Sequence, residues 1–365
     1  MADLPFAGSV GHTIGIELET TVIDATTGMP LDCASEIVAA VGTECQRGGT
    51  STELASACLE IKSGVGATVR QATDDLRAVT AACAPALGLH SARLLAMGLH
   101  PTIDETTGAM NASERYDWIR ESLRWTCADL YTCALQVHVG VPDGDAAVRA
   151  ARYLASYLPI LLAMTASSPM YRGEHTGLAS TRSSIFTRVP RSGLPPRWAS
   201  WAEYCDLVDA FTASGAMRGP LDAWWDIRLQ PALGTVEVRV CDALADPDCI
   251  AGIAAIAQCL VALSASETAP QLADAIAHEN RWTATRDGIR GCLITDDSGA
   301  ARPASDLACE LVHQLRDVAL DLGCSAELEG AHAMAEGRAA HQDLMGTYAA
   351  GGMARMLASM TLARQ

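Results

Sequence analysis

Several features that commonly identify a protein class are missing from this sequence. Basic residues are too few to balance the acidic ones, since 26 lysines and arginines stand against 43 aspartates and glutamates and the net charge is −17. No run of lysine or arginine interrupts this acidic composition. The chain should therefore repel a phosphate backbone, and we expect no nucleic-acid partner.

The thirteen cysteines form no metal-binding or disulfide pattern. No CxxC pair occurs, and residues such as Cys33, Cys58 and Cys133 are scattered along the chain. Their number is odd, and the first ten residues, MADLPFAGSV, lack the basic start and apolar core of a secretory signal. We therefore expect reduced, mostly buried cysteines in a cytoplasmic protein without a zinc site.

A long apolar run is missing as well. The longest one, CIAGIAAIAQCLVALSA, has 17 residues from Cys249 to Ala265 and contains Gln258. A helix that spans a membrane needs about 20 apolar residues. This segment is therefore expected to be a buried core helix, and no membrane partner is expected.

Two common nucleotide-binding motifs are also absent. The chain has neither GxxxxGK[ST] nor a GxGxxG between a strand and a helix, and it has no serine-hydrolase elbow. If the chain binds ATP, metal ions and arginine or lysine side chains must replace the glycine loop. The acidic composition does not exclude this, because a magnesium ion can lie between carboxylates and phosphates.

What is present fits a folded chain with a sizeable core, since 49% of the residues are apolar and 19% are charged. We find no internal repeat or linker, so we expect a single domain over residues 1–365, with residues 304–365 largely helical. Apolar residues at helical spacing predict helices over Ala67–Leu87, Ala112–Leu130, Asp145–Ala166, Trp198–Ala213, Pro247–Ser266 and Ala304–Leu322.

Strands are predicted by alternation. In GTVEVRVCD, valines alternate with Glu237 and Arg239, so apolar and charged side chains point to opposite faces. The same holds for HTIGIELETTVI, CLEIKS and ALQVHVG, whereas ARLLAMGLH is a mainly apolar strand expected to end at His100. One apolar face per strand favours a mostly antiparallel sheet covered by helices, an α+β fold.

The polar faces of four strands share one composition, dominated by carboxylates. The residues are Glu17, Glu19, Glu60, Lys62, Gln136, His138, Glu237 and Arg239. Adjacent carboxylates raise one another's pKa unless a cation lies between them, and Mg²⁺ or Mn²⁺ suits oxygen and imidazole ligands better than zinc does. From these residues alone, a divalent-metal site and an ordinary solvated face both remain open, and His138 alone is equally compatible with a structural histidine.

Several long blocks resemble a known family. Between Thr13 and Asp296 they include GIELETTVIDATTG, AMGLHP, LQVHVGVPDGDAAVR, WWDIRLQPALGTVEVRVCDA and ENRWTATRDG, in the family's order. They resemble the bacterial carboxylate–amine ligases, the YbdK-type branch of the glutamate–cysteine ligases. The resemblance implies a sheet curved into a funnel with a polar inner face, a glutamine-synthetase-like catalytic architecture, and a homodimer.

The resemblance also implies a reaction. ATP would phosphorylate the γ-carboxylate of L-glutamate, and the amine of an amino acid would displace the phosphate. The implied ligands of Mg²⁺ or Mn²⁺ are Glu17, Glu19, Glu60, His138 and Glu237. Glu53, seven residues before Glu60, would belong to the same catalytic site together with Glu237, and Arg239 would hold the transferred phosphoryl group.

Further residues are assigned to the substrates by the same resemblance. Asn280, Arg286 and Lys62 would join Arg239 around the nucleotide. Arg182 would bind the glutamate carboxylate, with Trp225, Gln136 and Tyr171 on the substrate side.

Departures from the family pattern leave the amine acceptor open. Leu18 replaces the middle one of three usual acids, Gln136 a usual histidine, and Leu229 a usual proline. Met170, Tyr171 and His175 replace two aromatics and an acid. Cysteine is the default acceptor, and another amino acid is the alternative. Two other functions stay open: a metal-dependent hydrolase or amidase on the same face, and a non-catalytic sensor of glutamate or a nucleotide.

Overall fold

The computed structural model describes residues 4–42, 47–103, 109–268 and 271–362. Its main element is a seven-stranded antiparallel sheet in the order β10–β11–β5–β1–β3–β2, with β4 beside β1. The strands are β1 (Ile14–Asp24), β2 (Gly49–Thr52), β3 (Cys58–Lys62), β4 (Ala92–Leu95), β5 (Ala134–Gly140), β10 (Ile227–Gln230) and β11 (Thr235–Asp242). The predicted α+β fold with a mostly antiparallel sheet is confirmed.

One strand prediction was wrong in its extent, because β4 ends at Leu95 and not at His100. After Leu95 the chain leaves the sheet: the Ala96 amide donates to the carbonyl of Met360, and the Gly98 amide donates to the hydroxyl of Ser167. Apolar character alone cannot distinguish a buried strand from a buried loop. Strands β2 and β10 were not predicted, since both are only four residues long.

The predicted helices are present, but three of them are broken in two, and a fourth, predicted over Ala112–Leu130, is α-helical only to Leu123. The helices of the first half are α1 (Ala34–Val41), α2 (Val69–Ala82), α3 (Ala84–Leu89), α4 (Glu114–Leu123), α5 (Gly144–Ala155), α6 (Leu158–Thr165) and α7 (Thr181–Phe186). Proline explains two breaks, because Pro85 and Pro159 lie in the first turns of α3 and α6, where a missing N–H is tolerated.

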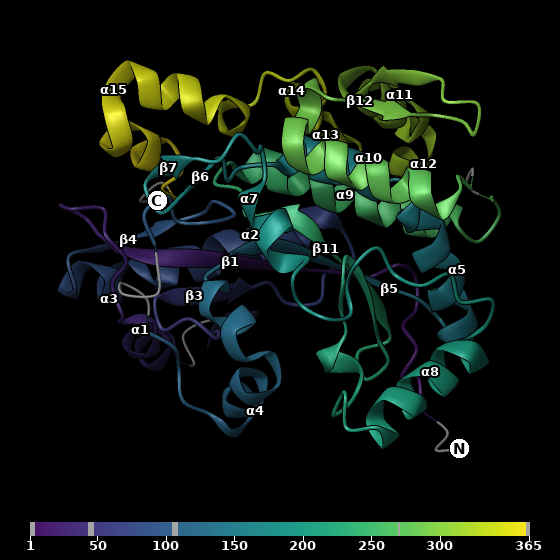
Figure 1. The fold of residues 1–365 in the computed structure, drawn as a ribbon, viewed down its shortest axis with the longest axis horizontal. Helices are drawn as coiled ribbons and strands as arrows, with labels where there is room; N and C mark the ends of the chain where they lie inside the picture. The colour runs from purple at the N-terminus through teal and green to yellow at the C-terminus, as the bar shows by residue number, and fades with distance from the viewer. Residues whose placement is uncertain (1–3, 43–46, 104–108, 269–270, 363–365) are drawn as a thin grey trace.

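The second half is helical after Pro303 in the part of the chain that the structure describes. Its helices are α8 (Trp201–Ala213), α9 (Pro247–Leu263), α10 (Asp274–Asp287), α11 (Ala304–Gln314), α12 (Arg316–Asp321), α13 (Ser325–Glu329), α14 (His332–Ala335) and α15 (Leu344–Ser359). Helix α10 was not predicted. Figure 1 places α9 to α12 on one side of β1 and β5, and α4 and α8 on the other side.

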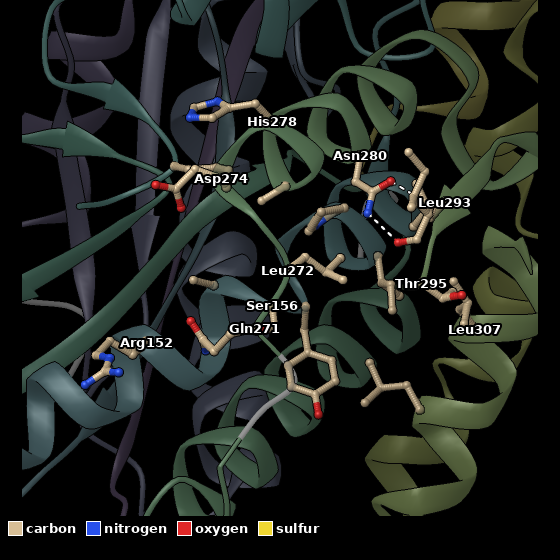
Figure 2. A pocket seen from close by; sticks show the side chains of 18 of the residues that line it. Arg152, Ser156, Gln271, Leu272, Asp274, His278, Asn280, Leu293, Thr295 and Leu307 are labelled. Atoms are coloured by element: carbon tan, nitrogen blue, oxygen red, sulfur yellow. Dashed lines mark hydrogen bonds between the residues drawn. The ribbon is translucent and has the colours of Figure 1, made fainter. Parts of the chain in front are cut away.

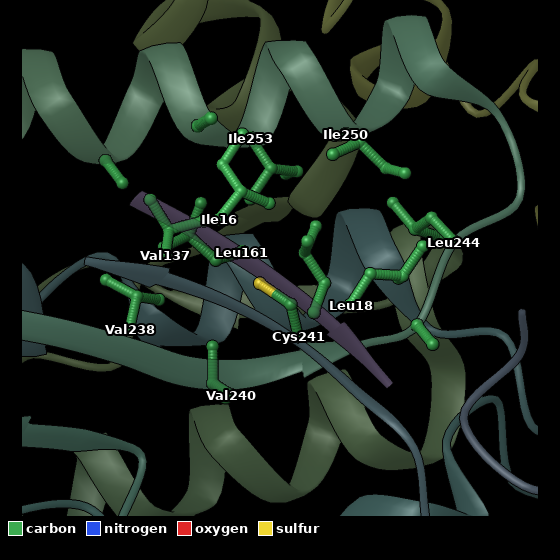
Figure 3. Packing of buried hydrophobic residues seen from close by; sticks show 14 of the residues in the cluster. Ile16, Leu18, Val137, Leu161, Val238, Val240, Cys241, Leu244, Ile250 and Ile253 are labelled. Carbon is green, nitrogen blue, oxygen red and sulfur yellow. The ribbon is translucent and has the colours of Figure 1, made fainter. Parts of the chain in front are cut away.

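The apolar face of the sheet forms the core. Ile16 and Leu18 of β1 and Val137 of β5 pack beneath Ile250 and Ile253 of α9 (Figure 3). Helices α2, α5 and α6 contact the same sheet. The long apolar run is therefore a buried core helix, as predicted, and none of the helices in the described ranges has the length and apolarity needed to cross a membrane.

The cysteines contribute to this core. Nine of the twelve described cysteines are buried, and Cys45 lies outside the described residues. The prediction of mostly buried cysteines is confirmed.

Candidate active site

Strand pairing brings the predicted polar residues into three rows across one face of the sheet. Arg228 of β10, Glu237 of β11 and His138 of β5 form the first row. Gln136 of β5, Glu17 of β1 and Lys62 of β3 form the second. Glu19 of β1, Glu60 of β3 and Ser51 of β2 form the third.

A cavity of about 190 Å³ opens over this face. We call it the acid cavity, because four carboxylates line it: Glu17, Glu19, Glu53 and Glu60. Four arginines and one amide complete its polar wall, namely Arg115, Arg182, Arg228, Arg239 and Gln136. The opposite wall is apolar and includes Leu54, Ile119, Leu123, Leu130, Phe186, Val189 and Trp224. The cavity can therefore hold a charged group against one wall and an apolar group against the other.

Glu237 is enclosed by donors. Its two carboxylate oxygens accept two hydrogen bonds from Arg228, at 2.8 and 3.0 Å, one from Gln230 at 2.6 Å, and one from Arg239. Burial would raise the pKa of this fully buried carboxyl, but Arg228 and Arg239 outweigh burial and hold it well below the usual range. A carboxylate has about four lone-pair positions, so binding a metal here would require one donor to move.

Three other carboxylates make no ion pair with an arginine in the described part of the chain. One oxygen each from Glu19, Glu53 and Glu60 lies within 4.8 Å of the others. Burial raises the pKa of Glu19 to about 7, although Arg239 and Arg182 act against it. Burial and the charges of Glu60 and Glu19 raise the pKa of Glu53 to about 8. We call these three residues the acidic group.

Hydrogen bonds hold the acidic group in place. Glu19 accepts from the Ala134 amide and from the Gln136 side chain, both at 2.6 Å. Glu60 accepts from the Ser51 hydroxyl at 2.5 Å and lies 3.2 Å from the Lys62 ammonium. Burial and the charge of Glu17 raise the pKa of Glu60 despite these donors. The carboxylates of Glu19 and Glu60 are thus fixed in direction while the mutual repulsion of the acidic group persists.

His138 presents a buried nitrogen without a hydrogen bond to any described residue. Its Nδ1 lies 3.0 Å from the Thr235 hydroxyl, while Nε2 lies 3.6 Å from Glu17 and 3.9 Å from Glu237. Burial lowers the pKa of His138, but Glu237 and Glu17 outweigh it and raise the pKa above its usual value. An imidazole oriented through Nδ1 with a free Nε2 is a common arrangement for a metal ligand.

A hard divalent cation fits this donor set. Three carboxylates within reach of one another provide the oxygen ligands that Mg²⁺ and Mn²⁺ accept. Glu17 lines the same cavity, and the Nε2 of His138 lies 3.6 Å from Glu17. A cation would also relieve the repulsion that raises the pKa values of Glu19 and Glu53.

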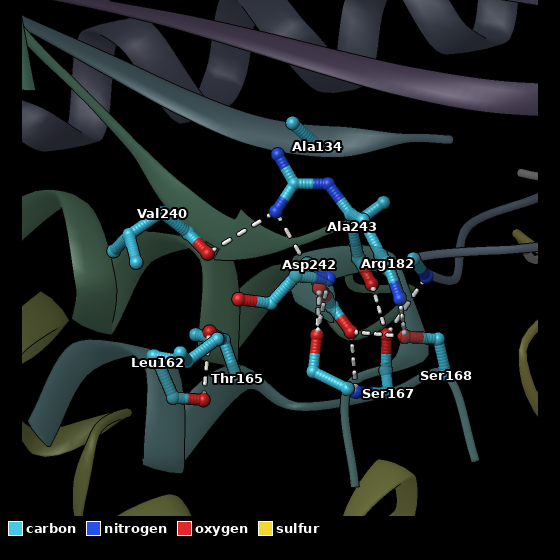
Figure 4. Close-up of polar contacts among 12 residues, drawn as sticks. Ala134, Leu162, Thr165, Ser167, Ser168, Arg182, Val240, Asp242 and Ala243 are labelled. Atoms are coloured by element: carbon cyan, nitrogen blue, oxygen red, sulfur yellow. Dashed lines mark hydrogen bonds and ion pairs between the residues drawn. The ribbon is translucent and has the colours of Figure 1, made fainter. Parts of the chain in front are cut away.

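Arg182 reaches the acid cavity and also supports β11 from behind (Figure 4). Its Nη1 donates to the Val240 carbonyl at 3.1 Å, its Nη2 donates to the Arg239 carbonyl at 3.0 Å, and Asp242 lies 3.5 Å away. Asp242 is fully buried and also accepts hydrogen bonds from Ser168 and Ser180. Arg182 therefore helps to place the strand that carries Arg239, and its buried Nε has no partner among the described residues.

Seven predicted residues do not line the acid cavity. Two of them, His138 and Glu237, lie beside it in the first row of the sheet face. The other five have separate partners. Lys62 is bound to Ser51 and Glu60, and Trp225 packs edge-on against Trp198 in the core. The Tyr171 hydroxyl donates to Asp129 at 2.5 Å. Arg286 pairs with its neighbour Asp287, and Asn280 bonds the backbone of Ile294. The substrate or nucleotide roles of these residues stay predictions.

The sequence reasoning missed Arg228 and Arg115. In WWDIRLQ, the polar Arg228 and Gln230 alternate with Ile227 and Leu229, which is the signal of a half-buried strand. This alternation would have placed Arg228 and Gln230 on the polar face of a strand. Arg115 lies on α4 and pairs with Asp222 at 3.4 Å, and no local pattern identifies it.

Comparisons with known proteins agree with this geometry. The model of glutamate–cysteine ligase family 2 (GCS2) matches residues 13–359. A protein of Rubrobacter xylanophilus assigned as glutamate–cysteine ligase 2-3 is 39% identical over 329 residues, covering 89% of each chain. One of Thermobifida fusca, assigned as glutamate–cysteine ligase 2, is 32% identical over 335 residues, covering 89% of this chain and 84% of its own.

Solved structures share the fold at much lower identity. A glutamate–cysteine ligase of Francisella tularensis in complex with AMP superposes with a TM-score of 0.69 at 12% identity, covering 98% of this chain and 88% of that one. A bifunctional glutathione synthetase of Pasteurella multocida gives 0.62 at 11% identity, covering 96% of this chain and 51% of that one. The family match and the close relatives settle the classification: the chain belongs to glutamate–cysteine ligase family 2.

Proposed function

We propose that this protein is an ATP-dependent ligase that joins the γ-carboxylate of L-glutamate to the amino group of an amino acid. The observation that carries the proposal is the charge pattern of the acid cavity, where the acidic group, Arg228 and Arg239 line the same space. Phosphoryl transfer from ATP to a carboxylate gathers negative charge, which needs a metal ion and fixed positive groups together.

The acidic group would hold Mg²⁺ or Mn²⁺, with Glu17 and His138 beside it. When bound, the ion supplies positive charge and orientation to the phosphates. The acidic group would keep the ion at the sheet face, because the carboxylates of Glu19 and Glu60 are held by Gln136, Ser51 and the Ala134 amide.

Arg239 is the residue we assign to the transferred phosphoryl group. Its Nη1 is held by Gln136 at 2.6 Å and by Glu237, while its buried Nε has no partner among the described residues. That N–H can donate to a phosphoryl oxygen as the γ-carboxylate of glutamate attacks phosphorus and ADP leaves. The amine then attacks the acyl carbon of the γ-glutamyl phosphate, and phosphate departs. No cysteine is needed as a nucleophile.

The identity of the amine acceptor is less determined than that of the carboxylate donor. Cysteine is the default acceptor for this family, and the apolar wall of Leu54, Leu130 and Phe186 would contact an acceptor's side chain. Arg182 would bind the carboxylate of glutamate through its free Nε. We further propose, by family resemblance, a funnel-shaped sheet of the glutamine synthetase kind, a homodimer and a cytoplasmic location.

Product analysis tests the proposal. The purified chain is incubated with ATP, Mg²⁺ and glutamate against a panel of amino acids, and ADP, phosphate and product masses are measured. We expect one ADP per γ-glutamyl amide formed. Arg239→Ala should lower turnover by about 100-fold or more, while Arg338→Ala, on an arginine with 66% of its side chain exposed, should not. No glutamate-dependent ADP with any amine would overturn the assignment.

A further inference from the structure

A second cavity in the described part of the chain is larger than the acid cavity. It measures about 490 Å³, and none of its lining residues lines the acid cavity. Five segments enclose it: the junction of α5 and α6, residues 194–197, the start of α10, the hairpin of β12 (Cys292–Ile294) and β13 (Ala301–Pro303), and α11. We call it the α10 cavity.

Apolar side chains surround most of this space. Tyr157, Leu194, Leu272 and Leu307 are only half-buried and face the cavity, with Leu311 behind them. In Figure 2, Asn280, Thr295 and Leu307 lie toward one end, and Arg152, Gln271 and Asp274 toward the other. Protein interiors are close-packed, and a cavity of this size falls within the range of about 300–1,000 Å³ typical of small-molecule sites.

The ionisable groups of the lining favour an anion. Three arginines line the cavity, and two of them are paired: Arg197 with Asp274 at 2.9 Å and Arg302 with Glu310 at 2.8 Å. Arg152 has no ion pair or hydrogen bond to any residue in the described ranges. One unpaired cation at the rim of an apolar cavity matches a ligand with one negative group.

Helix α10 connects this cavity to the catalytic face. Asn280 closes the cavity by exchanging hydrogen bonds of 2.8 and 2.7 Å with the backbone of Ile294. The next residue, Arg281, forms a buried bidentate pair with Asp226, at 2.6 and 3.0 Å. The Asp226 carbonyl in turn accepts the backbone N–H of Arg239 at 2.8 Å. A buried ion pair and one backbone hydrogen bond therefore connect α10 to the backbone of Arg239.

We propose that the α10 cavity is a second ligand site, for a small molecule with an apolar body and a single anionic group, and that its occupancy is communicated to Arg239 through Arg281 and Asp226. The proposal goes beyond the ligase reaction and does not depend on it. Ligand binding and its communication to Arg239 can each be measured without the substrates of the ligase reaction.

The binding half is tested with anilinonaphthalene sulfonate, an apolar probe with one anionic group. Fluorescence titration of the full chain should saturate at one equivalent. Ala277→Phe fills the cavity from α10 and should weaken binding by about tenfold or more, and so should Arg152→Glu, an exposed change that leaves the core intact. Ala275→Phe, on the exposed side of the same helix, is the matched control and should bind as the wild type does.

Absence of saturable binding would overturn the site. Wild-type affinity in both Ala277→Phe and Arg152→Glu would overturn it as well.

Communication between the α10 cavity and Arg239 is tested by hydrogen–deuterium exchange of residues 226–242. The probe should slow that exchange about threefold or more in the wild type. It should not do so in Arg281→Lys, which keeps the charge but loses the bidentate geometry. Equal protection in both proteins, or none in the wild type, would overturn the communication.

Discussion

The polar sheet face has two halves that treat buried carboxylates in opposite ways. In one half, Arg228 and Arg239 hold Glu237 ionised and supply it with donors on both oxygens. In the other half, Glu19 and Glu53 lie close to Glu60 without a guanidinium of their own, and their pKa values are raised to about 7 and about 8. The charge of Glu237 is thus balanced by arginines, whereas the charges of Glu19 and Glu53 are not.

This difference suggests separate roles for the two sets of carboxylates: Glu237 stabilises the fold, and the acidic group is available to a ligand. A buried ion pair satisfied on all sides gains nothing from an added cation, whereas three neighbouring carboxylates remain costly until one arrives. We therefore expect the Glu237 half to determine folding and the acidic group to determine metal binding.

The largest effect is expected at Glu237. Glu237→Gln should destabilise the fold by about 3 kcal/mol, because it leaves two buried guanidinium groups without their carboxylate. Urea unfolding at neutral pH measures this free energy. A loss below about 1 kcal/mol would contradict the assigned role.

The same substitution in the other half should act in the opposite direction. Glu53→Gln removes one of three repelling carboxylates, so the metal-free protein should gain about 1 kcal/mol in free energy of unfolding. Its affinity for Mn²⁺ should fall by about tenfold or more, as measured by calorimetric titration. If Glu53→Gln instead destabilised the metal-free protein, the contrast between the two halves would be lost.

The pH dependence of stability should follow from the acidic group. Glu19 and Glu53 titrate at about 7 and about 8 in the folded chain, against an ordinary value of 4.5. Between these values the folded state binds more protons than the unfolded state, so stability should fall as pH rises from about 5 to about 8. Melting temperatures with a chelator should show this fall, and saturating Mg²⁺ should reduce it. If the protein in the presence of the chelator became more stable as the pH rose over this range, the raised pKa values of Glu19 and Glu53 would be refuted.

The smallest effect is expected at Lys62, at the edge of the acidic group. Its ammonium lies 3.2 Å from Glu60, and 35% of its side chain is exposed. Lys62→Met should change stability by less than about 1 kcal/mol and should raise Mn²⁺ affinity about twofold, because a competing cation is gone. Reduced Mn²⁺ affinity would mean that Lys62 supports the site instead of competing with the ion.

The individual strands were predictable because their cause is local. Alternation with a period of two places Glu17 and Glu19 on one face of β1 and sends Leu18 to the core, and the structure has this arrangement. The same rule held for β5. For β11 the alternation did not predict the shift of register against β5 after Val238. Such a bulge depends on the pairing with the partner strand.

Long-range contacts were not predictable in this way. Asn280 and Arg286 belong to a segment that resembles the family, yet α10 directs Asn280 to another cavity and leaves Arg286 exposed beside Asp287. The pairing of Arg228 with Glu237 was missed because β10 is too short to stand out without its neighbour.

The sequence by itself therefore determined which side chains share a face within each strand, because backbone geometry imposes that on neighbouring residues. Only the tertiary structure decided which faces meet. Glu19 lies opposite Glu60, 41 positions away, and Glu237 opposite His138, 99 positions away, because packing of the apolar face orders the strands. That order separates Glu237, which pairs with two arginines, from the acidic group, which we propose binds a cation.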